Sequence, residues 1–233
     1  MLAVFVVAAG VVILVMLGFW QLERGAEKRN IKMEYDSRIN KTPLEDLSMM
    51  LDVDRFEFFR VSVTGVYIPG RQIFLDNRIL NGQPGFDVIT PLRITGTNMH
   101  VLVNRGWIPW GQDRNNPPQV ETPEGSQHIE GVLKHPADDY YTLEETSPTI
   151  DQVIWQNLDV AQYRKITGFT LQDMIIRLSP ESDAGGFVRE WPGYDSKWIA
   201  RHRGYAIQWF SLAFVLVIVS IATLVRRKRT VDN

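Results

Sequence analysis

The chain has 233 residues, of which 45% are hydrophobic and 22% charged, and its net charge is −2. That charge offers no basic surface for nucleic acid. There is no cysteine, which excludes disulfides, thiol catalysis and iron–sulfur clusters.

Two uncharged stretches enclose a polar middle: Leu2 to Trp20 and Tyr205 to Val225. As helices they would be roughly 28 and 31 Å long, enough to cross a bilayer. We predict a membrane protein of the α+β class, with one antiparallel β-rich extracytoplasmic domain between two transmembrane helices. The predicted segments are residues 1–20 (first transmembrane helix), 21–204 (outer domain), 205–225 (second transmembrane helix) and 226–233 (basic tail).

Basic residues beside the spans predict the orientation. Arg226 to Arg229 are four cations without an acidic neighbour, so the positive-inside rule places the C-terminus in the cytoplasm. Two spans then return the N-terminus to the same side, and the middle domain is periplasmic. Cations after the first span, among them Arg24 and Lys28, oppose this orientation. Because Met1 to Ala3 lack the basic start of a cleaved signal peptide, we expect an uncleaved anchor in a bacterial inner membrane.

After the first span, Leu22 to Ile39 are mostly good helix formers and predict a polar continuation of the helix. A short helix is expected over Leu44 to Leu51, and another over Asp159 to Thr167 with Asp159 as its cap.

The remaining pattern alternates between apolar and polar residues, which is typical of strands with one buried face. It predicts strands around Val61–Val63, Ile73–Leu75, Val101–Val103, Gln127–Leu133, Val153–Asn157 and Leu171–Leu178. Turn signals are expected to separate the strands at Gly65, Pro69-Gly70, Asn81-Gly82, Pro84-Gly85, Thr95-Gly96-Thr97 and Pro117-Pro118. Together they predict an antiparallel domain, either barrel-like or a sandwich.

Recognised motifs for dinucleotide, phosphate-loop, zincin and serine-hydrolase chemistry are missing from the sequence. His100, His128 and His135 are isolated and are interpreted as surface or turn residues. The acidic pairs Asp138-Asp139 and Glu144-Glu145 could in principle act as general acid and base. Adjacent side chains diverge, however, so a solvated loop is the simpler interpretation.

The start of the second span carries the most informative cluster. On a helix, His202, Tyr205, Ala206 and Trp209 lie on one face, at i, i+3, i+4 and i+7. Imidazole is a suitable axial ligand for haem iron, and a small residue between two aromatics leaves room for a flat ring. Arg201 and Arg203 could pair with propionate carboxylates.

The end of the first span should lie at the same depth and form the opposite wall, with Trp20, Gln21 and Arg24. A cofactor is not required to explain these residues, because Trp and Tyr are common at bilayer interfaces and basic side chains extend toward the headgroups. Membrane lipid is thus an expected neighbour in either case.

Several strings resemble the surfeit-locus cytochrome c oxidase assembly factors. They are residues 18–24 with Lys28, 59–67, 76–78, 82–86, 104–109, 186–191 and 202–213. The resemblance implies a non-enzymatic two-span protein that delivers haem a to the catalytic subunit of a haem–copper oxidase or helps to insert it. It also implies oxidase subunit I and haem a synthase as partners, and the family's proposed haem-ligating histidine falls on His202.

Two alternatives stay open. One is a cofactor-free scaffold that stabilises an oxidase assembly intermediate, and the other is a membrane-anchored enzyme that uses the acidic pairs. For Arg78, Arg105 and Trp107 we expect an architectural role rather than contact with a cofactor. Arg189-Glu190-Trp191 is expected to dock the domain on the bilayer.

Overall fold

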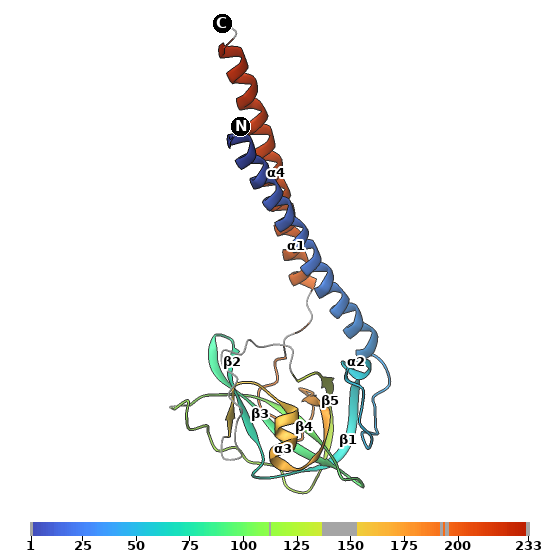
Figure 1. The fold of residues 1–233 in the computed structure, drawn as a ribbon. Coiled ribbons are helices and arrows are strands. Elements are labelled where there is room, and N and C mark those ends of the chain that lie inside the picture. The colour runs from blue at the N-terminus through green and yellow to red at the C-terminus, as the bar shows by residue number, and fades with distance from the viewer. Residues whose placement is uncertain (1, 112, 137–152, 192, 194–195, 232–233) are drawn as a thin grey trace. The chain divides into compact units, whose positions relative to one another are not determined.

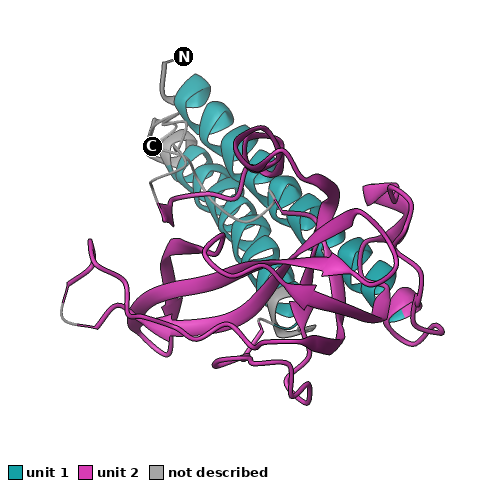
Figure 2. Ribbon diagram, turned by 90° about the horizontal axis from the view of Figure 1, so that it is seen from below, with its two compact units in different colours: residues 1–36, 193–233 teal, residues 37–192 magenta. Residues whose placement is uncertain are grey.

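The computed structural model describes residues 2–111, 113–136, 153–191, 193 and 196–231. The chain forms two compact units (Figure 1 and Figure 2). One unit combines the two ends of the chain, residues 1–36 and 193–233, and is called the helix hairpin below. The other, residues 37–192, is called the β domain. The acidic pairs at 138–139 and 144–145 lie outside the described residues.

The helix hairpin consists of α1 (Leu2–Ile39) and α4 (Ser196–Val231). Each contains a stretch long and apolar enough to cross a membrane. Most of the large apolar side chains in these stretches are exposed, as expected of helices that face lipid. The helix continues past Trp20 to Ile39, which confirms the predicted polar extension of the first span. This is the architecture of a two-span membrane protein with a central β domain.

The two helices meet along a seam whose residues recur at alternating spacings of three and four, the repeat of a coiled coil. The seam positions are Val11, Leu14, Gly18, Gln21 and Gly25 in α1, and Ile199, His202, Ala206, Trp209, Ala213, Leu216 and Ser220 in α4. Glycines allow close approach: a Cβ on Gly18 would lie 2.5 Å from the Phe210 ring. Gly10 faces Leu216 and Gly25 faces His202, so the helices are antiparallel. The C-terminal half of α1 therefore lies beside the N-terminal half of α4 (Figure 1).

In the described part of the β domain, seven strands form one sheet. They are β1 (Arg60–Tyr67), β2 (Ile73–Leu80), β3 (Gln83–Ile94), β4 (Met99–Pro109), β5 (Ser126–Lys134), β6 (Ile154–Trp155) and β7 (Thr170–Leu178). Their order is β1-β5-β7-β4-β3-β2-β6, and β1 also pairs with β3. This additional pairing closes β1, β5, β7, β4 and β3 into a ring, as the barrel-like prediction requires. The pairings are antiparallel except for β4 with β7 and β2 with β6.

Apolar side chains from all five ring strands form the main core. Val63, Leu92, Val101, Ile129 and Ile176 represent the five strands, and each is at most 3% exposed. A second core lies on the opposite face of the sheet, where apolar residues of β2, β3, β4, β6 and β7 pack with α3 (Val160–Thr167). The sheet is thus covered on both faces over part of its width.

The helix α3 begins and ends as the sequence predicts. The Asp159 side chain accepts a hydrogen bond from the Gln162 backbone N–H, which caps the first turn. Gly168 adopts the left-handed conformation at the C-terminus, which is the usual glycine cap. The predicted helix over Leu44 to Leu51 is wrong: Leu44 instead exchanges backbone hydrogen bonds with the start of β1, and a short helix α2 occupies Val53–Phe56.

Two predicted turns lie inside strands. Gly65 is within β1, where a Cβ would meet the Arg93 carbonyl oxygen at 2.6 Å, because β3 approaches closely to close the ring. Gly85 is within β3, where a Cβ would lie 2.4 Å from Cε2 of the Trp107 indole. Both glycines are needed for close packing rather than for reversing the chain. The predicted strand over 153–157 is shorter in the structure and covers only Ile154–Trp155.

Candidate functional site

His202 and Gln21 form a polar layer in the seam of the helix hairpin. The Nδ1 atom of His202 lies 2.8 Å from Oε1 of Gln21, and both side chains are half-buried. Small seam residues flank the layer, since Gly25 lies beside His202 and Ala206 is one turn further along α4. The histidine is therefore held between two helices at the boundary of the apolar spans.

This hydrogen bond determines which imidazole nitrogen is available to a ligand. With Oε1 of Gln21 as the partner, the tautomer of His202 that satisfies this contact is the one whose Nδ1–H donates to it. In the neutral ring Nε2 then presents its lone pair, which is the arrangement seen in metal-ligating histidines whose other nitrogen is anchored. No described residue makes a hydrogen bond or ion pair with Nε2.

Among the described residues, no group of three or more His, Cys, Asp or Glu side chains is placed to hold a metal ion. A single imidazole is instead the donor set that suits haem iron, since the porphyrin itself supplies the equatorial ligands. The chemistry of His202 thus fits a haem group.

The other predicted site residues fall in different places. Tyr205 and Trp20 are 45% and 49% exposed and lie on the outer surfaces of their helices. Arg24 is bonded to Glu27 on the same helix, with an N–O distance of 2.8 Å. Ala206 is only 1% exposed, so the gap expected beside it is closed by packing of the two helices. The structure brings His202 together with Gln21, and leaves Trp209 half-buried along the seam.

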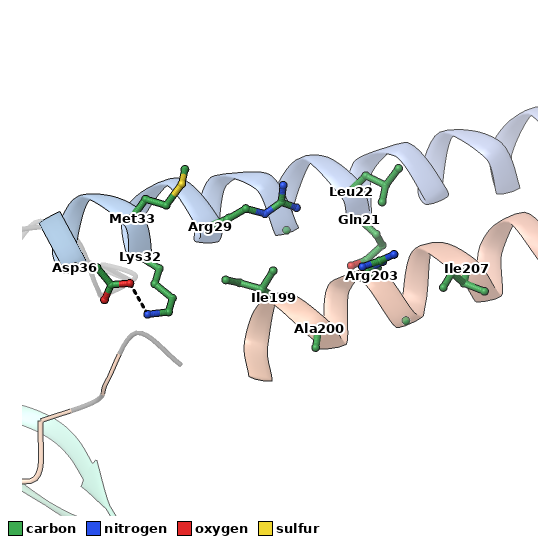
Figure 3. Close-up of a pocket in the computed structure, with 12 residues that line it drawn as sticks. Gln21, Leu22, Arg29, Lys32, Met33, Asp36, Ile199, Ala200, Arg203 and Ile207 are labelled. Atoms are coloured by element: carbon green, nitrogen blue, oxygen red, sulfur yellow. Dashed lines mark hydrogen bonds and ion pairs between the residues drawn. The ribbon is translucent and has the colours of Figure 1, made fainter. Parts of the chain in front are cut away.

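A groove of about 980 Å³ runs along the hairpin, and Gln21 of the polar layer is one of its lining residues (Figure 3). Its lining residues are Gln21, Leu22, Gly25, Arg29, Lys32, Met33 and Asp36 from α1, and Ile199, Ala200, Arg203, Gly204 and Ile207 from α4. The volume is typical of a small-molecule or cofactor site, and the walls are mainly apolar with a few charged groups. Among the predicted site residues, Gln21 and Arg203 contribute to it.

Sequence reasoning missed most of this groove, including Arg29, Met33 and Ile199. The three-and-four spacing of the seam could have located it, since it fixes which residues of each helix flank the contact line. Basic residues that follow the first span, such as Arg29, were interpreted only as signals of membrane orientation.

The strings inside the β domain are used to hold that domain together. The guanidinium of Arg105 donates to the Gly185 and Glu121 carbonyls at 2.7 and 2.8 Å. The Trp107 indole donates to the Arg78 carbonyl at 2.9 Å, and its backbone pairs with Val188. These contacts confirm the expected architectural role of Arg105 and Trp107. Arg78 contributes its backbone carbonyl, and its guanidinium lies 3.7 Å from the Asp87 carboxylate.

The segment Arg189-Glu190-Trp191, which was expected to dock on the bilayer, makes contacts inside the β domain. Arg189 donates to the Ser179 and Ser182 carbonyls at 2.6 and 2.7 Å. Trp191 donates to the Leu178 carbonyl at 2.9 Å. These polar groups are engaged within the β domain, which leaves bilayer docking without support from them.

A closed β domain between two apolar terminal helices in the chain, with a histidine layer at the end of the spans, defines a class of two-span membrane proteins. Comparison with known proteins identifies the family within that class. The SURF1 family model matches residues 8–214, so the chain belongs to the SURF1 family, known in general as cytochrome oxidase assembly factors. This is a family of assembly factors rather than of catalysts.

Relatives occur in bacteria and eukaryotes. A SURF1-like protein of Rickettsia felis is 27% identical over 215 residues, covering 90% of this chain and 91% of that protein. A SURF1-like protein of Monosiga brevicollis is 25% identical over 225 residues, covering 91% and 83%. Surfeit locus protein 1 of Arabidopsis thaliana is 35% identical over 105 residues, covering 40% of this chain and 30% of that protein.

Proposed function

We propose that the protein binds haem a transiently at the boundary of its apolar spans and aids its insertion into subunit I of a haem–copper oxidase. Membership of the SURF1 family supports the oxidase-assembly part of this proposal. The haem part is supported by one observation, the 2.8 Å contact between Nδ1 of His202 and Oε1 of Gln21, which anchors one ring nitrogen and leaves Nε2 to act as the donor to iron.

In this proposal each residue has a separate task. His202 provides the axial nitrogen, and Gln21 orients the imidazole and fixes its tautomer. A single protein ligand suits a carrier, because a haem held from one side can be passed on to a partner. Bound haem supplies no reaction here and is cargo for the oxidase. Haem a synthase would be the donor of that cargo.

The proposed location is the inner membrane of a bacterium, with the β domain in the periplasm and both termini in the cytoplasm. The antiparallel hairpin supports the same-side placement of the two ends. The basic run from Arg226 to Arg229 supports the cytoplasmic side.

The test is an absorption spectrum of the tagged full-length protein, purified from cells with and without haem a synthesis. Wild type should carry haem a only when it is made. His202→Ala should lose most of the haem, whereas His128→Ala, a histidine exposed on the β domain, should retain it. Gln21→Leu should weaken haem binding by about tenfold, as loss of an orienting hydrogen bond commonly does at metal sites. Gln21→Glu keeps an acceptor and should bind more tightly than Gln21→Leu.

The result that defeats the proposal is an unchanged haem spectrum in His202→Ala. A second readout tests the scaffold alternative: co-purification of the tagged protein with oxidase subunit I and haem a synthase. Normal oxidase yield with His202→Ala, together with retained subunit I, would favour a cofactor-free scaffold. The enzyme alternative instead requires that Glu144→Gln or Glu145→Gln abolishes oxidase assembly while haem content stays normal.

A further inference from the structure

The polar layer of the hairpin is flanked by small residues on both helices. On α1, Gln21 lies between Gly18 and Gly25, which are three residues before it and four after it and so share its face of the helix. Both glycines are buried. On α4, the residue four positions after His202 is Ala206, which is 1% exposed. Small residues let the two backbones approach closely where the imidazole and the amide meet.

Each of these glycines is opposed by a side chain of α4. A Cβ added to Gly25 would lie 3.4 Å from Cβ of His202, which is contact without overlap. A Cβ added to Gly18 would lie 2.5 Å from the Phe210 ring. That ring also packs edge-to-face on Phe19, with 5.4 Å between the ring centroids, so its neighbours restrict its rotation. A large side chain at either glycine would therefore increase the distance between the helices.

The distance between the helices decides whether the polar layer can form. Nδ1 of His202 and Oε1 of Gln21 are 2.8 Å apart, and a hydrogen bond of this kind is lost once the two atoms separate beyond about 3.5 Å. An imidazole without this anchor can rotate and can carry its hydrogen on either nitrogen. A small displacement of α1 would therefore end the arrangement in which Nε2 is held as the donor to iron.

We propose that Gly18 and Gly25 are positioning residues of the haem site: they hold α1 close enough for Gln21 to anchor His202, so haem affinity depends on closure of the seam. The proposal rests on the proposed function and adds to it a control exerted by helix packing. Because coupling between two equilibria is reciprocal, haem bound to His202 favours the closed seam. A partner that separates α1 from α4 would thereby lower haem affinity and promote release.

Haem affinity of the full-length protein in detergent tests the proposal, with haem a extracted from a purified oxidase as the probe. Gly18→Leu and Gly25→Leu should each weaken binding by about tenfold, the loss expected when an orienting contact to a metal ligand is removed. Gly25→Ala should weaken binding less than Gly25→Leu, because its methyl group reaches only contact distance. Ile13→Phe adds volume on an exposed face of α1 and is the matched control, whose affinity should equal that of wild type.

A double-mutant cycle separates positioning from general damage to the hairpin. Since Gly18 acts through Gln21 in this proposal, the double variant Gly18→Leu Gln21→Leu should bind only about tenfold more weakly than wild type. Independent effects would multiply to about a hundredfold. Phe210→Ala should rescue Gly18→Leu, because it removes the ring with which the leucine overlaps. Circular dichroism of each variant reports whether the helices still form.

Cross-linking tests the reverse direction of the coupling. Gly10 faces Leu216 further along the seam, so Gly10→Cys with Leu216→Cys reports closure. In the Gly18→Leu background, addition of haem a should restore part of the cross-linking that the leucine lowers. Adding His202→Ala to that background should abolish the effect of haem.

The outcomes distinguish this inference from the proposed function. Absence of haem a binding by wild type, or an unchanged affinity in His202→Ala, overturns both. Binding that requires His202 but keeps wild-type affinity in Gly18→Leu and Gly25→Leu overturns this inference alone. A loss of about a hundredfold in the Gly18→Leu Gln21→Leu variant, or no rescue by Phe210→Ala, also overturns it, because the glycine would then act on the hairpin as a whole.

Discussion

The β domain and the helix hairpin use their arginines in opposite ways. Arg105 is 2% exposed, donates to two backbone carbonyls and lies over the rings of Phe187 and Tyr67. In the hairpin, Arg29 and Arg203 line a groove and have no partner among the described residues. Polar groups bonded inside a fold stabilise it, whereas exposed ones along a groove remain in contact with solvent.

This difference indicates that the family-like segments of the sequence have separate roles in the two units. Those in the β domain close the ring and attach the segment around Val188 to β4. Those at the ends of the spans create the histidine layer and the groove. Substitutions in the first set should therefore act on stability, and substitutions in the second on binding.

The largest effect is expected for Arg105→Met in the β domain. Methionine keeps much of the packing but leaves the Gly185 and Glu121 carbonyls without their donors. Loss of these buried charge-assisted bonds should lower the free energy of unfolding by about 3–5 kcal/mol. Urea unfolding of the full-length protein in detergent, followed by tryptophan fluorescence, measures it.

Arg93→Met provides the matched control, because Arg93 is exposed on the neighbouring strand β3. Its unfolding free energy should stay within about 0.5 kcal/mol of wild type. Equal effects of the two substitutions would contradict the structural role given to Arg105.

A somewhat smaller loss is expected for Gly85→Ala. The new methyl group would lie 2.2 Å from the Ile108 carbonyl oxygen and against the Trp107 indole, so β3 and β4 would have to separate. Overpacking of this kind should cost about 2–3 kcal/mol in the same unfolding experiment. Gly82→Ala tests the conformational contribution separately, since Gly82 has a φ of 80° and nothing within 4 Å. It should cost about 1 kcal/mol, and a larger loss there than at Gly85 would exclude the packing explanation.

Gly85 also shows where the fold could not be predicted from the sequence. Pro84-Gly85 is a typical turn signal, and the sequence analysis predicted no strand over Gln83–Ile94, the residues of β3. The regular alternation in β1 and β7, in contrast, predicted those strands correctly. Closure of the ring depends on β1 pairing with β3 across the intervening β2. A contact between non-adjacent strands leaves no local pattern, so the sequence could indicate a barrel without giving its strand order.

For the candidate site, the sequence identified the histidine layer but not the groove. His202 and Gln21 lie next to apolar spans, where polar residues are conspicuous. The groove depends on how α1 and α4 are rotated against each other, and this is decided by packing of residues such as Gly18 and Phe210. Ala206 illustrates the difficulty. From the sequence, its small side chain predicted a gap, whereas in the structure it lies in a close contact between the two helices.

In the hairpin, Gly18→Leu should weaken the seam without affecting the β domain. A Cβ at this position would already lie 2.5 Å from Phe210, so a leucine should force the helices apart, at a cost of about 1–2 kcal/mol. The chain has no cysteine, so Gly10→Cys with Leu216→Cys can report the distance by cross-linking. Cross-linking should be efficient in the wild-type background and fall several-fold with Gly18→Leu.

The matched control for the seam is Ile13→Phe, which adds volume on an exposed face of the same helix. Cross-linking between positions 10 and 216 should not change in that variant. If Ile13→Phe lowered it as strongly as Gly18→Leu, the seam would lie on a different face of α1.

The smallest expected effect concerns pH and the Asp87 carboxyl of the β domain. Burial raises the pKa of Asp87, and the hydrogen bond from Asn104 and the charges of Arg78 and Arg177 oppose that shift only in part. Between the unfolded-state value of about 3.9 and this raised pKa, the folded protein binds more protons than the unfolded chain. The contribution of Asp87 to stability is therefore lost as the pH rises through this window.

Asp87→Asn removes this titration. The unfolding free energy of the variant minus that of wild type should therefore increase from about pH 4 upward. Loss of the contact with Arg78 adds a constant to this difference and does not change its slope. Asp46 should behave in the opposite sense, because the hydrogen bond from Ser48 lowers the pKa of its carboxyl. For Asp46→Asn the difference should decrease as the pH rises. Urea unfolding of both variants at several pH values checks the signs, and equal slopes would mean that burial does not control Asp87.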